Sequence, residues 1–432
     1  MNNQNMHEAA QRARNAAVEM AVLRSEQKNR ALESIITVLR ENEKAIFDAN
    51  NRDIAQAKSE GVAHPLLKRL VFDENKLAGV IKGIEALIAL DDPVGRIQLA
   101  TELDEGLELY RVSCPIGVIG MIFESRPDAL VQISTLCLKS GNSVLLKGGR
   151  EALETNRVLA SCIAEGALRE GLPEAWIYNI ESREEVAQML SMDSEIDLLV
   201  PRGSNEFVRY IMDNSRIPVM GHADGICHTY IHTSADLGTA VRIAVDGKAQ
   251  YVAVCNATET ILIDKAVVKI ILPVLLAALE EAGVRIKACP VCRELIPELE
   301  EAVEEDWSTE YLDLIVSIKA VEGLEAAVEH INRYGSGHTD AIVATDEAAW
   351  DYFSSRVDSA NVFANCSTRF SDGFRYGFGA EVGISTGKLH ARGPVGLEGL
   401  LTYKYKLIGK GQIVADYASG KKHFTHRKLD IS

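Results

Sequence analysis

Residues 117–150 read GVIGMIFESRPDALVQISTLCLKSGNSVLLKGGR and carry the pattern that decides the fold. The apolar runs at 117–123 and 142–148 are typical of buried strands, and the segment at about 128–140 between them has the spacing of a helix. The alternation continues with expected strands at 175–180 and 196–201 and helices at about 151–170, 183–191 and 204–213. Strands that alternate with helices predict a parallel sheet covered by helices.

A second alternating region lies further along the chain. It contains expected strands at 226–232, 285–288, 313–319 and 340–344, and helices at 235–249, 266–282 and 322–332. Two successive α/β units predict two lobes with a small-molecule site between them. Residues 8 to about 58 and 75–90 predict amphipathic helices. Residues 399–409 suit an edge strand, or a strand that pairs with another subunit.

Composition limits the functions that the chain can have. The chain has 432 residues and a formal net charge of −16, which argues against nucleic-acid or anionic-membrane binding. No apolar run approaches the length of a membrane span, and the N-terminus lacks the apolar core of a signal peptide. The eight cysteines are widely spread, which is typical of reduced thiols, so we expect a cytoplasmic protein.

One cysteine stands at an unusual place. The stretch YVAVCNATETILI (251–263) has Cys255 where an apolar run, which resembles the end of a buried strand or helix, gives way to a small polar turn that begins with Asn256. A structural cysteine normally lies inside an apolar run, whereas a reactive one needs an accessible edge. This position raises the question of what the thiol does.

Three strand-to-helix turns are candidate ligand sites. In LLKGGREALETN a strand ends at Lys147 and is followed by Gly148, Gly149 and Arg150, while LLVPRGSNEFV places Gly203 and the N-cap candidate Ser204 before a helix. Amide groups at such helix starts attract phosphates, although neither stretch has the GxGxxG fingerprint and both can be read as ordinary turns. In IFESRPD the polar residues Glu124, Ser125 and Arg126 follow a strand directly, either as crevice residues or as a solvated loop.

Metal binding is not expected from the residue spacing. His222, His228 and His232 do not form an HExxH motif, and the CPVC motif at 289–292 has no second pair of cysteines to complete a zinc site. The glycine-rich stretch at 377–400 predicts an irregular loop that carries positive charge, from Lys388, His390 and Arg392.

Taken together, the motifs are more specific than any one of them. The chain resembles the γ-glutamyl phosphate reductase (glutamate-5-semialdehyde dehydrogenase) family of the aldehyde dehydrogenase superfamily. The resemblance runs nearly end to end and rests on these stretches, in order: PIGVIGMIFESRPD, LLKGGREALETN, VPRGSNEF, GHADGICHTYIH, CNATET, TEYLDLI, INRYGSGHTDAI and GAEVGISTGKLHARGPVGLEGL…TYKY.

The resemblance implies a reaction and a fold. The reaction is reduction of L-glutamyl 5-phosphate to L-glutamate 5-semialdehyde and phosphate, the second step of proline biosynthesis from glutamate. Cys255 aligns with the catalytic thiol, which we expect a strand to deliver to the cleft, and the reaction proceeds through a Cys255 thioester. The usual side-chain oxyanion donor aligns near Ser125, so Ser125 or the adjacent Arg126 would serve beside the Cys255 N–H, and Asn256 completes the expected catalytic set. The implied fold is two α/β lobes, one for the cofactor and one catalytic, plus a small β oligomerisation flap.

The cofactor residues follow from the same resemblance. Lys147 matches the lysine that holds the adenosine ribose, and Glu310 matches the glutamate that positions the nicotinamide ribose. Where NAD-preferring relatives usually have a glutamate, this chain has Arg150, which favours the 2′-phosphate of NADP over the hydroxyl of NAD. The full expected cofactor set is Lys147, Gly148, Gly149, Arg150, Gly203, Ser204 and Glu310.

Departures from the superfamily pattern bear on the substrate. The stretch GHADGICH lacks the glutamate that activates water in hydrolytic relatives, which suits release of the acyl group by phosphate. Asp128 stands where the family has asparagine, so a substrate hydrogen bond is not carried over to it. The expected substrate-binding residues are Arg126, His222, Lys388, His390 and Arg392.

The resemblance also implies partners and a domain division. We expect a homo-oligomer, dimeric or tetrameric, that receives a labile acyl phosphate made by a separate enzyme, with glutamate 5-kinase as candidate partner. The expected division is a discontinuous NADP-binding domain (1–105 and 128–222), a catalytic domain (223–357) and oligomerisation strands (106–127 and 379–415). The alternatives are a phosphate-independent aldehyde dehydrogenase of the same superfamily and a non-catalytic oligomeric scaffold.

Overall fold

The first lobe is built on a four-stranded parallel sheet. The computed structural model describes residues 3–62, 64–124, 126–181, 183–222, 224–378 and 381–431. The strand order in this sheet is β5-β4-β3-β6, and the strands are β3 (Val118–Phe123), β4 (Ser143–Lys147), β5 (Ile177–Asn179) and β6 (Leu198–Arg202). Its helices are α1 (Asn3–Met20), α2 (Ser25–Glu41), α3 (Glu43–Ser59), α4 (His64–Leu70), α5 (Glu74–Ala89), α6 (Pro127–Lys139), α7 (Leu153–Arg169), α8 (Arg183–Met189) and α9 (Asn205–Asn214).

Helices cover both faces of this sheet, which explains its continuous apolar strands. Every residue of β3 is buried. Ile119 and Met121 point into a core shared with α2, α5, α6 and α7, whereas Val118 and Ile122 face a second core under α1, α8 and α9. Side chains alternate along a strand, so one apolar run supplies both cores.

The second lobe contains a seven-stranded parallel sheet. The strand order is β10-β9-β11-β8-β7-β12-β13. The strands are β7 (Cys227–Ile231), β8 (Thr258–Asp264), β9 (Arg285–Ala288), β10 (Glu300–Glu301), β11 (Ile315–Val321), β12 (Thr339–Val343) and β13 (Asn361–Ala364). The helices are α10 (Leu237–Ala249), α11 (Val268–Glu281), α12 (Pro290–Leu295), α13 (Gly323–Tyr334) and α14 (Glu347–Arg356). The predicted α/β lobes are confirmed.

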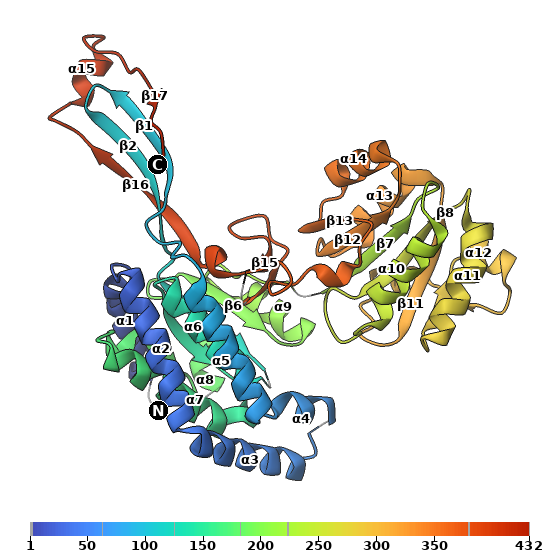
Figure 1. The fold of residues 1–432 in the computed structure, drawn as a ribbon, viewed down its shortest axis with the longest axis horizontal. Helices are drawn as coiled ribbons and strands as arrows, with labels where there is room; N and C mark the ends of the chain where they lie inside the picture. The colour runs from blue at the N-terminus through green and yellow to red at the C-terminus, as the bar shows by residue number, and fades with distance from the viewer. Residues whose placement is uncertain are drawn as a thin grey trace.

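A long antiparallel arm projects away from both lobes (Figure 1). Its strand order is β16-β2-β1-β17, formed by β1 (Ile97–Asp104), β2 (Leu107–Pro115), β16 (Leu401–Ile408) and β17 (Arg427–Lys428), with the short helix α15 (Val414–Ala418) near its tip. Seven of the eight residues of β16 are exposed, and β16 forms one edge of the sheet, as the sequence predicted. The hairpin of β14 (Gly383–Ser385) and β15 (Gly393–Val395) lies closer to the lobes.

Two strands lie outside the expected domain division. β3 was expected among the oligomerisation strands but lies inside the parallel sheet, where it pairs with both β4 and β6. β1 was expected in the first lobe but pairs with β2 in the arm. The reason is that the chain leaves the arm at Pro115 and enters the first sheet only at Val118, so the change of sheet falls between them.

No helix among the described residues combines the length and the apolar character needed to cross a membrane.

Helix packing in the first lobe gives a test of the fold. A Cβ added at Gly166 in α7 would lie 2.7 Å from the Cα of Ile35 in α2, whereas one added at Gly83 in α5 would meet nothing within 4 Å. We expect Gly166→Ala to lower the free energy of unfolding by about 1–3 kcal/mol through overpacking. Gly83→Ala should raise it by about 0.5–1 kcal/mol, because alanine has the higher helix propensity. Denaturant titration of both variants would measure this, and equal effects would contradict the α2–α7 packing.

Candidate active site

Cys255 lies in a turn at the start of a strand and not at the end of one. α10 ends at Ala249 and β8 begins at Thr258, so the expectation that a strand delivers the thiol to the cleft is wrong. Residues 252–254 are only half-buried and form bends, and the N–H of Ala257 donates to the carbonyl of Val254 at 3.2 Å. The apolar run was mistaken for a strand because it has β-type residues, but it pairs with no strand in the described part of the chain.

The amino-terminal ends of three adjacent strands meet at this thiol. In the order β8-β7-β12, Cys255 precedes β8, Cys227 begins β7 and His338 precedes β12. The Nε2 of His338 lies 3.1 Å from the Sγ of Cys255, and the Sγ of Cys227 lies 3.2 Å from the carbonyl oxygen of Cys255. His338 is fully buried, whereas Cys255 is half-buried. The arrangement places a nucleophile against a histidine nitrogen.

The imidazole of His338 is held from its other side. Its Nδ1 lies 2.8 Å from the Oγ1 of Thr339, and that hydroxyl also accepts from the Nδ2 of Asn361 at 3.2 Å. These contacts fix the orientation of the His338 ring, and acceptance of the thiol proton at Nε2 requires the tautomer that carries its proton on Nδ1, with the Thr339 hydroxyl accepting.

Gly225 allows the thiol loop to approach β7. A Cβ at this position would lie 2.1 Å from the carbonyl oxygen of Cys255 and 2.4 Å from its Cα. Both contacts are with backbone, so no side-chain rotation can relieve them. Glycine is therefore required at position 225 by the position of Cys255.

His222 approaches the same place from the first lobe. Its ring lies 4.9 Å from the ring of His338 in an edge-on arrangement, and its Nδ1–H donates to the carbonyl of Ile384 at 2.7 Å. Burial lowers the pKa of His222, so the ring is neutral and its Nε2 is unprotonated.

Guanidinium groups lie within electrostatic reach of the thiol. Arg202 ends β6, and Arg369 lies in the turn that follows β13; the charge of a Cys255 thiolate acts on both. The Nε of Arg369 donates to the Oε1 of Gln250 at 3.0 Å, and the carboxylate with the largest effect is Glu381 on Arg202 and Asp372 on Arg369. The pKa of Arg202 is lowered, first by burial and second by the positive charge of the neighbouring Arg126. The pKa of Arg369 is also lowered, first by burial and second by the neighbouring charge of Arg375. Guanidinium groups are suited to the binding of an anion.

The other expected catalytic residues differ in what they contact. The Nδ2 of Asn256 donates to the carbonyl of Ser371 at 2.7 Å, which ties the thiol turn to the turn that carries Arg369. The Oδ1 of Asn256 and the Oγ of Ser371 are buried without a partner among the described residues. Ser125 lies outside the described residues.

Arg126 is bound to the residue that departs from the family pattern. Its Nη2 donates to the Oδ2 of Asp128 at 2.9 Å, and Lys76 approaches the same oxygen at 3.4 Å. Burial alone would raise the pKa of Asp128, but Arg126 and then Lys76 outweigh it and lower the pKa. Asp128 is thus an ionised partner of Arg126.

The first group of expected cofactor residues lies at the carboxyl end of β4. Lys147 is buried, and its Nζ donates to the carbonyl of Gly148 at 2.5 Å. A Cβ at Gly148 would lie 2.0 Å from the Nδ2 of Asn156, and one at Gly149 would lie 2.0 Å from the Oε1 of Glu151. Close packing against the buried Asn156 thus favours glycine at position 148, whereas the flexible side chain of Glu151 could move away from a Cβ at position 149. Arg150 is exposed and donates to the Oε2 of Glu60 at 3.1 Å.

The second group surrounds the start of α9. Ser204 caps this helix by accepting from the N–H of Phe207, and the N–H of Ser204 itself donates to the Oε2 of Glu124 at 3.2 Å. A Cβ at Gly203 would lie 2.9 Å from the same carboxylate oxygen. The Oε2 of Glu310 accepts from the Nδ2 of Asn205 at 2.6 Å, so the two lobes meet through these side chains.

The three cationic residues of the glycine-rich stretch have partners within the chain. Lys388 and Arg392 both pair with Asp358, and the Nε2 of His390 donates to the carbonyl of Gly399 at 2.7 Å. None of these contacts involves the thiol turn. The structure thus brings Cys255, His222 and His338 together and places Arg126 with Arg202, while these three cations are held elsewhere.

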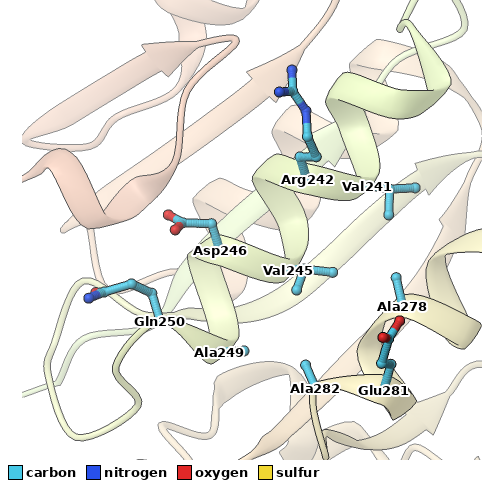
Figure 2. Close-up of a pocket in the computed structure, with 9 residues that line it drawn as sticks. All are labelled: Val241, Arg242, Val245, Asp246, Ala249, Gln250, Ala278, Glu281 and Ala282. Carbon is cyan, nitrogen blue, oxygen red and sulfur yellow. The ribbon is translucent and has the colours of Figure 1, made fainter.

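One surface groove lies away from the thiol. It has a volume of about 570 Å³ and lies between α10 and α11 (Figure 2). Its lining residues are Val241, Arg242, Val245, Asp246, Ala249, Gln250, Ala278, Glu281 and Ala282. It lacks a nucleophile and touches the active site only through Gln250, the partner of Arg369.

Sequence reasoning missed three residues of the site. His338 stands in the motif INRYGSGHTDAI, which was used for the resemblance without a role for its histidine. Arg202 directly follows an expected strand, and Arg369 lies in a stretch to which no element was assigned. A search for polar residues at the amino-terminal ends of expected strands would have found His338.

Comparison with known proteins identifies the family of the chain. The chain belongs to the aldehyde dehydrogenase family, whose model matches residues 1–288. Within it, the chain is 61% identical over 423 residues to the γ-glutamyl phosphate reductase of Acetivibrio thermocellus and 60% identical over 425 residues to that of Pelotomaculum thermopropionicum, with 98% of each chain covered in both cases. The crystal structure of γ-glutamyl phosphate reductase from Thermotoga maritima superposes with a TM-score of 0.93 at 39% identity, covering 94% of this chain and 99% of that one.

The close approach at Gly225 can be tested directly. We expect Gly225→Ala to displace the Cys255 backbone and to slow alkylation of Cys255 by iodoacetamide at least tenfold, because the thiol leaves the Nε2 of His338. Gly221→Ala is the matched control on the same segment, since its Cβ would meet only ordinary contacts at 3.7–3.8 Å. Mass spectrometry of the alkylated peptide measures the rate. Equal rates in the two variants would contradict the proposed constraint.

Proposed function

We propose that the chain catalyses reduction of L-glutamyl 5-phosphate to L-glutamate 5-semialdehyde and inorganic phosphate with NADPH as reductant. The observation that carries this proposal is the contact of Cys255 with His338 beside the two guanidinium groups of Arg202 and Arg369. The full-length identity of 61% to a γ-glutamyl phosphate reductase supports the choice of substrate.

The thiol is activated by the imidazole. The Nε2 of His338 accepts the proton of Cys255, and the resulting thiolate attacks the acyl carbon of the substrate. Phosphate leaves and a thioester on Cys255 remains. A bound nicotinamide cofactor supplies the hydride that reduces this thioester. The tetrahedral adduct on Cys255 then collapses, releasing the aldehyde and returning the thiolate.

Arg202 and Arg369 are the groups that we assign to the anionic substrate. The substrate carries a phosphoryl group at the reacting carbon and a carboxylate at its other end, so it needs two cationic sites. Both guanidinium groups lie within electrostatic reach of a Cys255 thiolate, although the carboxylates of Glu381 and Asp372 also act on Arg202 and Arg369, respectively. Lys388 and Arg392, expected earlier, already share Asp358, so we place them outside the reacting centre.

The oxyanion of the tetrahedral adduct needs donors. The N–H of Cys255 is one candidate, since it donates to no backbone carbonyl in the described part of the chain. Ser125 or Arg126 would be the second, and loss of such a donor typically costs about 3–4 kcal/mol of transition-state stabilisation.

Residues of the first lobe fit a dinucleotide. The ammonium of Lys147 lies at the carboxyl end of β4, and the two glycines keep the following turn open. Glu310 belongs to the second lobe and contacts Asn205 of the first. Lys147 and Arg150 would hold the adenosine ribose and its 2′-phosphate, while Glu310 would hold the nicotinamide ribose. A ligand phosphate at the start of α9 would have to displace the carboxylate of Glu124.

Phosphate, and not water, is the proposed acyl acceptor in the reverse direction. The carboxylate in the stretch GHADGICH is that of Asp224, which pairs with Arg209 and accepts from Asn205 at 3.0 Å. An ion-paired carboxylate is a poor general base for water. This argues against hydrolytic release of the thioester.

The compartment, the oligomeric state and the source of the acyl phosphate are also proposals. We infer a cytoplasmic homo-oligomer that receives its labile acyl phosphate from a kinase reaction. The exposed edge of β16 supports association between copies of the chain.

Phosphate dependence tests the reaction. With glutamate 5-semialdehyde and NADP⁺, the purified protein should form NADPH only when inorganic phosphate is present, measured by absorbance. Cys255→Ser should lower the rate at least a thousandfold, because a hydroxyl is a far weaker nucleophile near neutral pH. Cys114→Ser, in the arm, is the control for loss of a thiol. Turnover without phosphate would contradict the proposal in favour of an ordinary aldehyde dehydrogenase.

Cofactor preference tests the role of Arg150. We expect Arg150→Glu to lower the ratio of kcat/KM for NADP⁺ over NAD⁺ by about tenfold to a hundredfold, since a charge-assisted hydrogen bond to the 2′-phosphate is replaced by repulsion. Arg169→Glu, at the far end of α7 and paired with Glu41 and Glu165, makes the same change in net charge as a control. An unchanged ratio in Arg150→Glu would show that another residue selects the cofactor.

A further inference from the structure

His222, Cys255 and His338 form a cluster with the dimensions of a metal site. One ligand atom from each of them lies within 4.8 Å of the others, and the closest pair is the Sγ of Cys255 and the Nε2 of His338 at 3.1 Å. Zn–S bonds near 2.3 Å and Zn–N bonds near 2.0–2.1 Å place tetrahedral ligand atoms about 3.4–3.7 Å apart. Shifts of about 1 Å or less in the side chains would therefore seat a zinc ion.

The surroundings of the two histidines prepare them as ligands. The Nδ1 of His222 donates to the carbonyl of Ile384 at 2.7 Å, and the Nδ1 of His338 lies 2.8 Å from the Oγ1 of Thr339. With the Nδ1 atoms engaged, the Nε2 atoms are the ring nitrogens left for a metal, and that of His338 lies 3.1 Å from the Sγ of Cys255. Hydrogen bonds of this kind are what orient histidines in metal sites. They form a second observation, independent of the distances.

We propose that this cluster is an inhibitory site for Zn²⁺ and similar thiophilic divalent cations. Coordinate bonds form from the Sγ of Cys255 and the Nε2 atoms of His222 and His338, and the thiol proton passes to solvent, with no change of oxidation state. Three protein ligands leave a fourth position for water or a phosphate oxygen. Coordination occupies the sulfur lone pair that attacks the substrate, so the metal-bound protein is inactive.

Metal binding at this site needs only the three side chains, so it does not require that the proposed reaction is correct. It differs from the His222, His228 and His232 set considered from the sequence. His228 is buried against Asp340 at 2.9 Å, and the Nδ1 of His232 lies 2.9 Å from the Oγ of Ser234, so neither faces the thiol.

Cobalt provides the test, because Co²⁺ bound to a thiolate absorbs in the near-ultraviolet and Zn²⁺ does not. Titration of the full chain with Co²⁺ should give one charge-transfer band of one equivalent per chain, and Zn²⁺ should abolish it by competition. Cys255→Ser should lose the band. His222→Gln and His338→Gln should each weaken binding at least tenfold, and Thr339→Val about tenfold through the orientation of His338. Cys114→Ser, a half-exposed thiol in the arm, should bind like the unmodified chain.

The rate of Cys255 alkylation tests metal binding without any measurement of enzyme activity. Zn²⁺ should slow alkylation of Cys255 by iodoacetamide, and a chelator should restore the rate, whether or not the protein turns over glutamate 5-semialdehyde. A band that persists in Cys255→Ser, or unchanged affinity in both histidine variants, would overturn the proposal. Phosphate-dependent activity without any band would also overturn it while leaving the reductase function intact.

Discussion

The active site depends on a contact between two stretches of backbone, Gly225 and Cys255. A side chain of any size at position 225 would overlap the carbonyl oxygen of Cys255, so the thiol turn can reach His338 only because this position is bare. Cys227 then fixes the same carbonyl from the start of β7. The position of the reactive sulfur is thus set by main-chain packing, which varies less than the conformation of a side chain.

The two lobes use opposite edges of their sheets. The expected cofactor residues follow the carboxyl ends of β4 and β6, as is usual in parallel sheets. The thiol site instead collects the residues that precede β8, β7 and β12. Because these strands are neighbours in the sheet, residues far apart in the chain, such as Gly225, Cys255 and His338, come together without long side chains. We propose that the substrate binds where the carboxyl edge of the first sheet meets the amino edge of the second.

This geometry explains how much the sequence could predict. The alternation of strands and helices was sufficient for the two lobes, since burial on both faces leaves long apolar runs. The exposed edge strand was indicated instead by Tyr403 and Tyr405, which alternate with lysines. It was not sufficient for the boundary between arm and lobe, because β2 and β3 are separated by two residues only. His338 escaped notice since catalytic residues were sought at strand carboxyl ends. The partners of Lys388 and Arg392 were also hidden, because Asp358 lies some thirty residues away in the chain.

The arm has a stability different from that of the lobes. Its strands carry few buried side chains: β16 buries only Leu401, and neither residue of β17 is buried. A sheet with solvent on most of its surface opens at low free-energy cost, because few apolar contacts are lost. In an isolated chain, the backbone amides of the arm would therefore exchange with deuterium well before those of β3 or β8, and a protease would cut there first.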